Sequence, residues 1–251
     1  MLSFKHRRYT YHARRASPAP EGLGWISRYR CRVRCGGAGV KDLLLYVADA
    51  DAAAFMTGVL NKPQALEIRP ITFDAERHPQ RDNGMVQSGA ELARMKKGKY
   101  QKVLMAWDHH GSGREHRYSP EEVRKDVQGR LDSYTWSGNN SICIFVPELE
   151  QWLWFCESAL LAHCGITESQ LGIWVASYAE KKRTPVDTIK KSEPKELFEH
   201  IMYDCLRRTI SPRDFEEIGR RASVTKLMNC ESFRDIILVL RSWFPIENTG
   251  N

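Results

Sequence analysis

The sequence lacks the features that mark several specialised classes of protein. No apolar run approaches the roughly 18–20 residues that a membrane span requires. The first residues contain no apolar segment followed by a small-residue cleavage site, as a secretory signal would. The seven cysteines are an odd number and include no Cys-x-x-Cys pair, which favours reduced thiols over a disulfide framework. We therefore expect a cytoplasmic protein with no membrane partner.

One cluster within the cysteine set has an alternative interpretation as a metal site. Cys156, His163 and Cys164 lie close together in the sequence and are all ligands that zinc accepts. They stand in an apolar stretch, however, and their spacing is not that of a zinc finger. Since cysteine is among the most frequently buried residues, we favour core packing at this position.

The excess of positive charge is confined to one end of the chain. The formal net charge is +7, from 38 Lys and Arg against 31 Asp and Glu. Residues 1–39 hold nine of the basic residues and a single acid, Glu21, so the remaining 212 residues carry 29 basic and 30 acidic side chains. The body of the protein is therefore nearly neutral, and the overall charge gives no argument for DNA binding.

Two interpretations of this basic arm remain open. An Arg-rich tail binds nucleic acid through its phosphates. Alternatively Met1 is a mis-called start, since the arm has no periodicity and ends at Val40, where a strand begins. Valine is encoded by GTG among other codons, and GTG is an alternative bacterial start. We favour the mis-called start.

Apolar runs alternate with helical patterns beyond Val40, which predicts an α/β fold. We expect a mainly parallel, four-stranded sheet with helices on both faces, with strands over 43–47, 68–73, 102–107 and 141–146. Pro70 makes the second strand short or an edge strand. We expect a loop over 74–84 and helices over 52–60, 88–97 and 119–133, the last capped by Ser119.

The composition changes after about Gly165. We expect an α/β domain over residues 40–165 and a helical C-terminal region over 166–251. The polar stretch near 179–194 is typical of a linker. Helices are predicted near 195–208, 212–222 and 232–244.

Acidic residues follow three of the four predicted strands. Asp49 and Asp51 follow the first, Asp108 the third, and Glu148 and Glu150 the fourth. Loops at the carboxyl ends of parallel strands meet at one edge of the sheet, where like charges repel and a divalent cation relieves the repulsion. These oxygen ligands favour Mg²⁺, and the predicted metal ligands are Asp49, Asp108, Glu148 and Glu150.

Some of these acids also have a structural interpretation. Asp51 is as well explained by capping the helix that follows it. Glu150 stands in a first helical turn, where an acid favours the helix dipole. Asp108 follows an apolar strand and precedes a glycine-containing turn, so a site role is favoured for it, and for Glu148 after Pro147.

Histidines and arginines near these acids are further candidates. His110 is a candidate catalytic residue beside Asp108 and Glu148, since histidine titrates near neutral pH. A solvated turn is the equal alternative for His109 and His110. Arg81, His109 and Arg114 are candidates for contacting a phosphate substrate.

Several motifs together resemble a known family. The turns at Asp49 and at Asp108-His109-His110-Gly111, and the segment Pro147-Glu148-Leu149-Glu150-Gln151-Trp152, resemble Toprim-like proteins of bacterial defence islands. The segments 61–71, 78–82, 191–196 and 241–245 are similar to a component, the fourth, of the methylation-associated defence system. The resemblance spans about 40–245 and leaves out the basic arm.

The resemblance implies an anti-phage role and partners among the other components of such a system. Toprim domains hold Mg²⁺ with a Glu after the first strand and Asp-x-Asp after the third. The matching positions are Ala48 or Asp49, and Asp108 with His110, so this chain departs from the pattern at two places. A histidine among the ligands shifts the preference towards Mn²⁺ or another transition metal.

Two functions follow as hypotheses. The first is a nuclease dependent on Mg²⁺ or Mn²⁺, or a related effector acting on phosphodiester bonds. The second is a non-catalytic Toprim-like module that binds a partner protein, nucleic acid or nucleotide within the defence complex. The departures at Asp49 and His110 and the neutral body favour the second.

Overall fold

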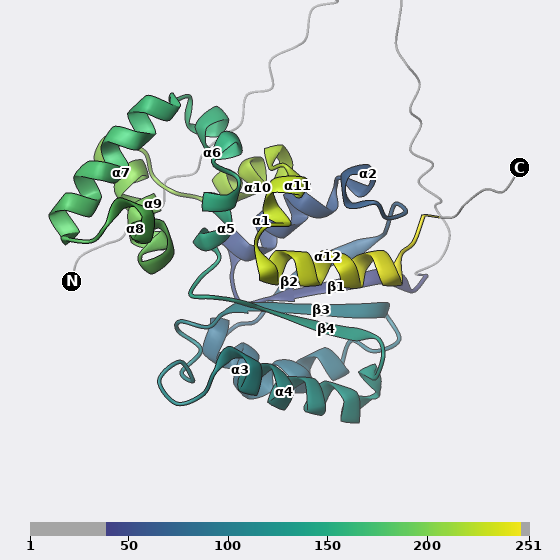
Figure 1. The fold of residues 1–251 in the computed structure, drawn as a ribbon. Coiled ribbons are helices and arrows are strands. Elements are labelled where there is room, and N and C mark those ends of the chain that lie inside the picture. The colour runs from purple at the N-terminus through teal and green to yellow at the C-terminus, as the bar shows by residue number, and fades with distance from the viewer. Residues whose placement is uncertain (1–38, 247–251) are drawn as a thin grey trace, which may run out of the picture. The chain divides into compact units, whose positions relative to one another are not determined.

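The computed structural model describes residues 39–246, and these form one compact unit around a four-stranded sheet (Figure 1). The sheet order is β2-β1-β3-β4, and every neighbouring pair is parallel. The strands are β1 (Lys41–Val47), β2 (Phe73–Arg77), β3 (Tyr100–Asp108) and β4 (Asn140–Phe145). The expected α/β class, with a parallel sheet between helices, is confirmed. The basic arm, apart from Gly39, lies outside the described residues.

Helices cover both faces of the sheet, as Figure 1 shows. Alternate side chains of β1 divide between two cores: Leu43 and Leu45 pack with helices α1 (Ala50–Leu60) and α12 (Glu231–Trp243), while Leu44 packs with α3 (Arg81–Arg94) and α4 (Pro120–Leu131). Burial on both faces explains why the strand reads as an unbroken apolar run.

Most of the remaining helices follow β4 and precede α12 in the sequence. They are α5 (Glu150–Phe155), α6 (Glu157–Cys164), α7 (Glu168–Lys182), α8 (Val186–Ser192), α9 (Pro194–Glu199), the short π-helix η2 (His200–Cys205), α10 (Pro212–Arg221) and α11 (Val224–Leu227). Two smaller pieces, α2 (Pro63–Leu66) and the π-helix η1 (Asp132–Trp136), complete the chain.

We call the helices from α5 to α11 the helical lobe. Helix α10 of this lobe packs against α1 through two glycines. A Cβ atom added to Gly58 would lie 2.4 Å from the carbonyl oxygen of Glu216, and one added to Gly219 would lie 2.4 Å from that of Phe55. The two backbones are therefore in direct contact, which only residues without a side chain allow. Since α1 begins directly after β1, this contact holds α10 close to the carboxyl end of the sheet.

The second strand lies later in the sequence than expected. Strand β2 covers Phe73–Arg77 rather than 68–73, and α3 begins at Arg81 within the stretch expected to be a loop. The prediction was wrong because β2 is an edge strand, mostly half-exposed, and needs few apolar residues. The edge position itself, inferred from Pro70, is confirmed.

The C-terminal half also differs from the expectation. The expected linker at 179–194 consists of the end of α7, a short turn and α8, and Ile189 within it is fully buried. No boundary separates the described residues at Gly165, because the helices after it pack into the same core as the sheet. Sequence alone cannot identify a short amphipathic helix whose apolar face is two or three residues wide.

Other predicted elements are confirmed. Ser119 accepts a hydrogen bond from the backbone N–H of Glu122, whose carboxylate accepts in return from the N–H of Ser119, so α4 begins with a capping box. The helices expected near 212–222 and 232–244 are α10 and α12. Within residues 39–246, no helix combines the length and apolar character that a membrane crossing requires.

Candidate functional site

The sheet topology opens a crevice between the carboxyl ends of β1 and β3. The chain leaves β1 through α1 towards β2, then returns through α3 and passes beyond β1 to form β3. The loops after β1 and β3 therefore turn to opposite faces of the sheet, at the point where the strand order reverses. In open parallel sheets this switch point is the usual place for a ligand.

Asp49 borders the crevice at the end of β1 and caps helix α1. Its Oδ1 accepts hydrogen bonds from the backbone N–H groups of Asp51, at 3.0 Å, and Ala52, at 2.9 Å. The capping role that the sequence suggested for Asp51 thus belongs to Asp49. Burial, followed by repulsion from Asp49, raises the pKa of Asp51 to about 6.

Asp108 borders the other side of the crevice and is fixed by the backbone around it. Its Oδ1 accepts a hydrogen bond of 2.9 Å from the N–H of Leu149, and its own N–H donates to Oδ1 of Asp82, also at 2.9 Å. Burial raises the pKa of Asp108 well above its ordinary value, and repulsion from Glu150, Asp82 and Asp49 adds to this effect.

Two further carboxylates come from the turn after β4. Glu148 and Glu150 are each only 7% exposed. Burial raises the pKa of Glu150 to about 7, partly opposed by Lys195 and reinforced by Glu148 and Asp49. Oε1 of Glu148 lies 3.1 Å from Nδ1 of His110, whose side chain is 61% exposed. His110 is therefore mostly exposed, while its partner Glu148 is buried.

One cation from the helical lobe faces these acids. Lys195, near the start of α9, places its Nζ 4.0 Å from Oε1 of Glu148. Burial alone would lower its pKa, but the charges of Glu150, Glu148 and Asp108 outweigh that effect, and the pKa is raised. Lys195 therefore carries a positive charge at neutral pH and offsets part of the repulsion.

Several of the residues described above line two spaces that share part of their lining. The first, which we call the acidic cavity, has a volume of about 150 Å³. Its lining holds five carboxylates and one lysine: Asp49, Asp51, Asp108, Leu149, Glu150, Lys195, Glu199, Tyr203, Ile210 and Phe215. The second is larger, about 600 Å³, and shares Asp49, Asp51 and Lys195 with the first. Arg77, His78 and Arg81 line its outer side.

Hydrogen bonding leaves oxygen atoms available in the acidic cavity. Asp49 and Asp108 both accept backbone hydrogen bonds through Oδ1 alone, so within residues 39–246 the Oδ2 atoms accept none. In their present rotamers no three His, Cys, Asp or Glu side chains of the described chain converge enough to hold a metal ion. The site thus offers free carboxylate oxygens without a closed coordination shell.

No family model, no curated protein and no solved structure matches this chain.

The candidate substrate-binding residues do not all lie at this crevice. Arg81 lines the larger space beside Asp49. His109 follows Asp108, and burial lowers its pKa. Arg114 instead lines a separate cavity of about 280 Å³ between α3 and α4.

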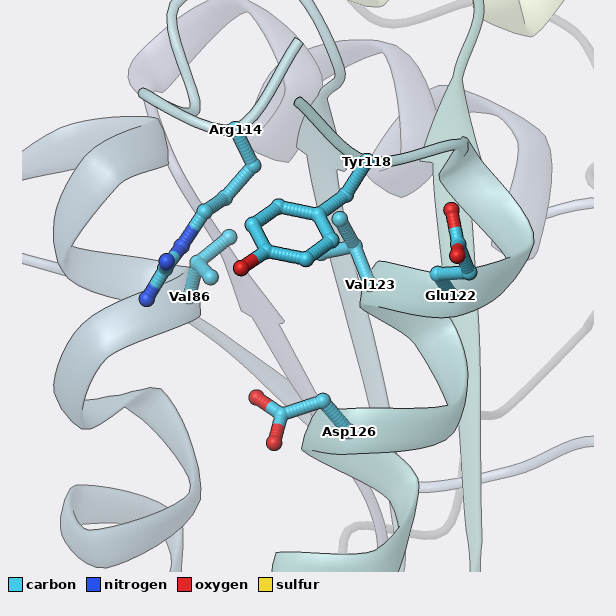
Figure 2. Close-up of a pocket in the computed structure, with 6 residues that line it drawn as sticks. All are labelled: Val86, Arg114, Tyr118, Glu122, Val123 and Asp126. Carbon is cyan, nitrogen blue, oxygen red and sulfur yellow. The ribbon is translucent and has the colours of Figure 1, made fainter. Parts of the chain in front are cut away.

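Figure 2 shows this separate cavity, with the side chains of Arg114 and Tyr118 side by side and those of Glu122 and Asp126 on α4. The guanidinium carbon of Arg114 lies 5.6 Å from the centre of the Tyr118 ring. Val86 and Val123 are the apolar members of the lining. None of the crevice carboxylates belongs to this lining, so the structure separates Arg114 from Asp108.

Sequence reasoning missed two members of the site. Asp82 was regarded as part of a loop, but it lies in the first turn of α3 and holds the N–H of Asp108; burial, with repulsion from Asp49, raises its pKa. Lys195 is 45 residues or more from every strand-end carboxylate in the cavity, and no local pattern marked it. The Pro194 that precedes it, typical of a first helical turn, was the available signal for α9.

The cysteines expected to pack in the core lie in or beside it. Cys156 is fully buried, and its thiol donates to the carbonyl oxygen of Trp152. His163 does not face either cysteine as a ligand but bonds Asp214, with 2.8 Å between Nε2 and Oδ1.

Proposed function

We propose that the crevice is a divalent-cation-dependent site that acts on phosphodiester bonds, in a Toprim-like protein that serves anti-phage defence in the bacterial cytoplasm. The observation that carries the proposal is the convergence of Asp49, Asp82, Asp108 and Glu150 at the switch point. The pKa values of the last three are raised by burial and by repulsion from neighbouring carboxylates, Asp49 among them in each case. A folded protein keeps such mutual repulsion where function requires it.

The donor chemistry of the cavity fits magnesium or manganese. Carboxylate oxygens are the ligands these cations prefer, and Oδ2 of Asp49 and of Asp108 is left free by the local hydrogen bonds. Asp49, Asp108 and Glu150 would hold the cation, with Glu148 beside them. When bound, such a cation supplies electrostatic stabilisation to a phosphoryl group and lowers the pKa of a coordinated water.

The residues around the cavity supply the other functions of a phosphodiester site. Arg81 and Lys195 line the space next to the carboxylates and offer positive charge to a phosphate. His110 bonds Glu148 through Nδ1 and is mostly exposed, so its Nε2 is open to a water or a leaving oxygen. Glu148 orients the ring, and imidazole is a common general acid or base in catalysis.

The defence role rests on the sequence resemblance over about residues 40–245. The parallel sheet with acids at its carboxyl edge is consistent with a Toprim-like frame. The partners proposed on this ground are the other components of the system. Replacing Asp108 with alanine should abolish protection against phage, while the circular dichroism spectrum stays that of the wild type.

Calorimetric titration with Mg²⁺ and with Mn²⁺ tests the site directly. The wild type should bind at least one of the two, and Asp108→Asn should bind at least tenfold more weakly. Asp187→Asn, which changes an exposed acid on α8, is the matched control and should bind as the wild type does. Absence of binding by the wild type with both cations would overturn the proposal.

A second function is favoured by a specific observation. Lys195 already faces Glu148 and Glu150, as a charge-neutralising group does in a site that no longer holds a cation. On this alternative the chain is a non-catalytic module of the defence complex. It predicts no cleavage of labelled DNA or RNA with either cation, and co-purification with another component that survives Asp108→Asn.

A further inference from the structure

The helical lobe carries a second polar cavity that the proposed function does not use. It has a volume of about 550 Å³ and is lined by His163, Thr209, Ser211 and three arginines, Arg207, Arg208 and Arg213. All three arginines are exposed. We call this space the basic cavity.

The carboxylates at the basic cavity are already neutralised by other partners. Asp214 is 6% exposed and lies 2.8 Å from Nε2 of His163 and 3.3 Å from Nη2 of Arg208. It also accepts hydrogen bonds from the backbone N–H and the hydroxyl of Ser211, at 2.8 and 2.7 Å. Glu217 pairs with Arg220 at 2.5 Å and with Arg221 at 3.7 Å, both on its own helix.

Two positive charges are left over after this pairing. Within residues 39–246 neither Arg207 nor Arg213 forms a salt bridge, although both line the same cavity as Arg208. Three guanidinium groups around one space repel one another, and this repulsion opposes folding. An anion with several oxygens would satisfy them together, since each guanidinium offers a planar fork of donors.

The basic cavity and the acidic cavity share one wall. Within the segment 207–215, Ile210 and Phe215 line the acidic cavity, while Thr209 and Ser211, on either side of Ile210, line the basic one. A single short stretch of chain therefore separates a set of carboxylates from three arginines, of which only Arg208 forms a salt bridge within residues 39–246. An anion in the basic cavity would lie across this stretch from the acidic cavity.

We propose that Arg207, Arg208 and Arg213 bind a backbone phosphate of a nucleic-acid strand whose neighbouring phosphodiester reaches the acidic cavity. The site lies on the helical lobe, outside the sheet and its strand-end loops. That the neighbouring phosphodiester reaches the acidic cavity rests on the proposed function, whereas the arginine site itself does not. Guanidinium groups recognise phosphate in any sequence, so the binding is independent of base identity.

The test measures binding without any cleavage. A fluorescently labelled 12-nucleotide single strand, as DNA and as RNA, is titrated with protein in EDTA at several salt concentrations. Arg207→Gln/Arg213→Gln should weaken binding at least tenfold and reduce the slope of log affinity against log salt by about 0.7, the value for one lost phosphate contact on a single strand. The DNA and RNA arms identify which strand binds more tightly.

Lys125→Gln/Arg234→Gln removes the same charge from exposed positions on α4 and α12 and serves as the control. It should change affinity less than threefold. Equal losses in the two double variants would mean non-specific attraction and would overturn the proposal, as would wild-type affinity in the arginine variant.

Length dependence separates a strand from a small anion. The 12-mer should bind the wild type at least tenfold more tightly than a mononucleotide does, and 10 mM inorganic phosphate should compete only weakly. Equal affinity for the mononucleotide would overturn the proposal that the ligand is a nucleic-acid strand.

Asp108→Asn should bind the 12-mer at least as tightly as the wild type does. A failure of the cation site therefore leaves this binding intact, and the two proposals fail separately.

Discussion

Carboxylates at two kinds of place in this molecule differ in the direction of their pKa shifts. Asp42 and Asp214 are 9% and 6% exposed, and their pKa values are lowered. Glu150, at 7% exposed, and Asp108 have raised pKa values. Burial raises the pKa of a carboxyl group at all four positions, so the difference lies in the partners.

The first pair is surrounded by donors. Asp42 accepts hydrogen bonds from Arg69, at 2.6 Å, and from the N–H and hydroxyl of Thr72, and these outweigh the effect of burial. Asp214 is held in the same way by His163 and Ser211. The second pair faces other acids, with Lys195 as a partial counter-charge. A buried carboxylate with hydrogen-bond donors stabilises the fold, whereas a buried carboxylate among like charges is typical of a functional site.

The largest expected effect is the loss of a well-partnered carboxylate. Asp214→Ala removes the capping box of α10 and leaves His163 and Arg208 without their partner. It should lower the free energy of unfolding by about 2–4 kcal/mol, measured by urea denaturation. Asp187→Ala, an exposed acid, should change it by less than about 0.5 kcal/mol. A similar small change in Asp214→Ala would remove the distinction between the two pairs.

Removing the charge of Glu150 is expected to raise the free energy of unfolding instead of lowering it. An unfolded glutamate loses its proton near pH 4.5, while Glu150 in the folded state keeps it up to about pH 7. The folded state therefore binds more protons between these values, and stability falls as the pH rises through them. At pH 8 Glu150→Gln should raise the free energy of unfolding by about 1–3 kcal/mol, and at pH 4 the two proteins should be equal.

Thermal or urea unfolding at pH 4, 6 and 8 measures this difference. A Glu150→Gln variant that is less stable than the wild type at pH 8 would show that the carboxylate is bound by donors after all.

The smallest effect concerns the counter-charge. Lys195→Met keeps the aliphatic stem but removes the ammonium group that faces Glu148 and Glu150, and should lower stability at pH 8 by about 1 kcal/mol. The loss should be smaller at pH 5, where Glu150 is protonated. Lys191→Met, on the exposed side of α8, is the control and should be neutral at both values. An equal loss at both pH values would point to packing instead of charge.

Much of the fold followed from local patterns. The runs at 43–47 and 102–107 are strands because continuous apolar sequence fits only a sheet covered on both faces. Ser119-Pro120 marked the start of α4 through capping chemistry that acts within one turn. Strand β2 and helix α8 were not predicted at their positions because their apolar faces are short and depend on distant partners. In both, tertiary packing decides against the local pattern.

The site divides in the same way. Asp108, Glu148 and Glu150 were recognised because a strand end is visible in sequence, and parallel strands bring such ends to one edge. The cap of α1 is Asp49 and not Asp51, a difference of two residues that only backbone geometry decides. Asp82 joined the cluster through a hydrogen bond to Asp108, and Lys195 through the packing of α9 against α5.

The sequence by itself determined the parallel α/β class and the acidic character of the carboxyl edge. These depend on residue types and short periodicities, which act over a few positions. Only the tertiary structure decided that Lys195 balances those acids, that Arg114 belongs to another cavity, and that Arg207 and Arg213 stand unpaired behind the same wall. Such relations join residues far apart in the chain, and packing alone brings them together.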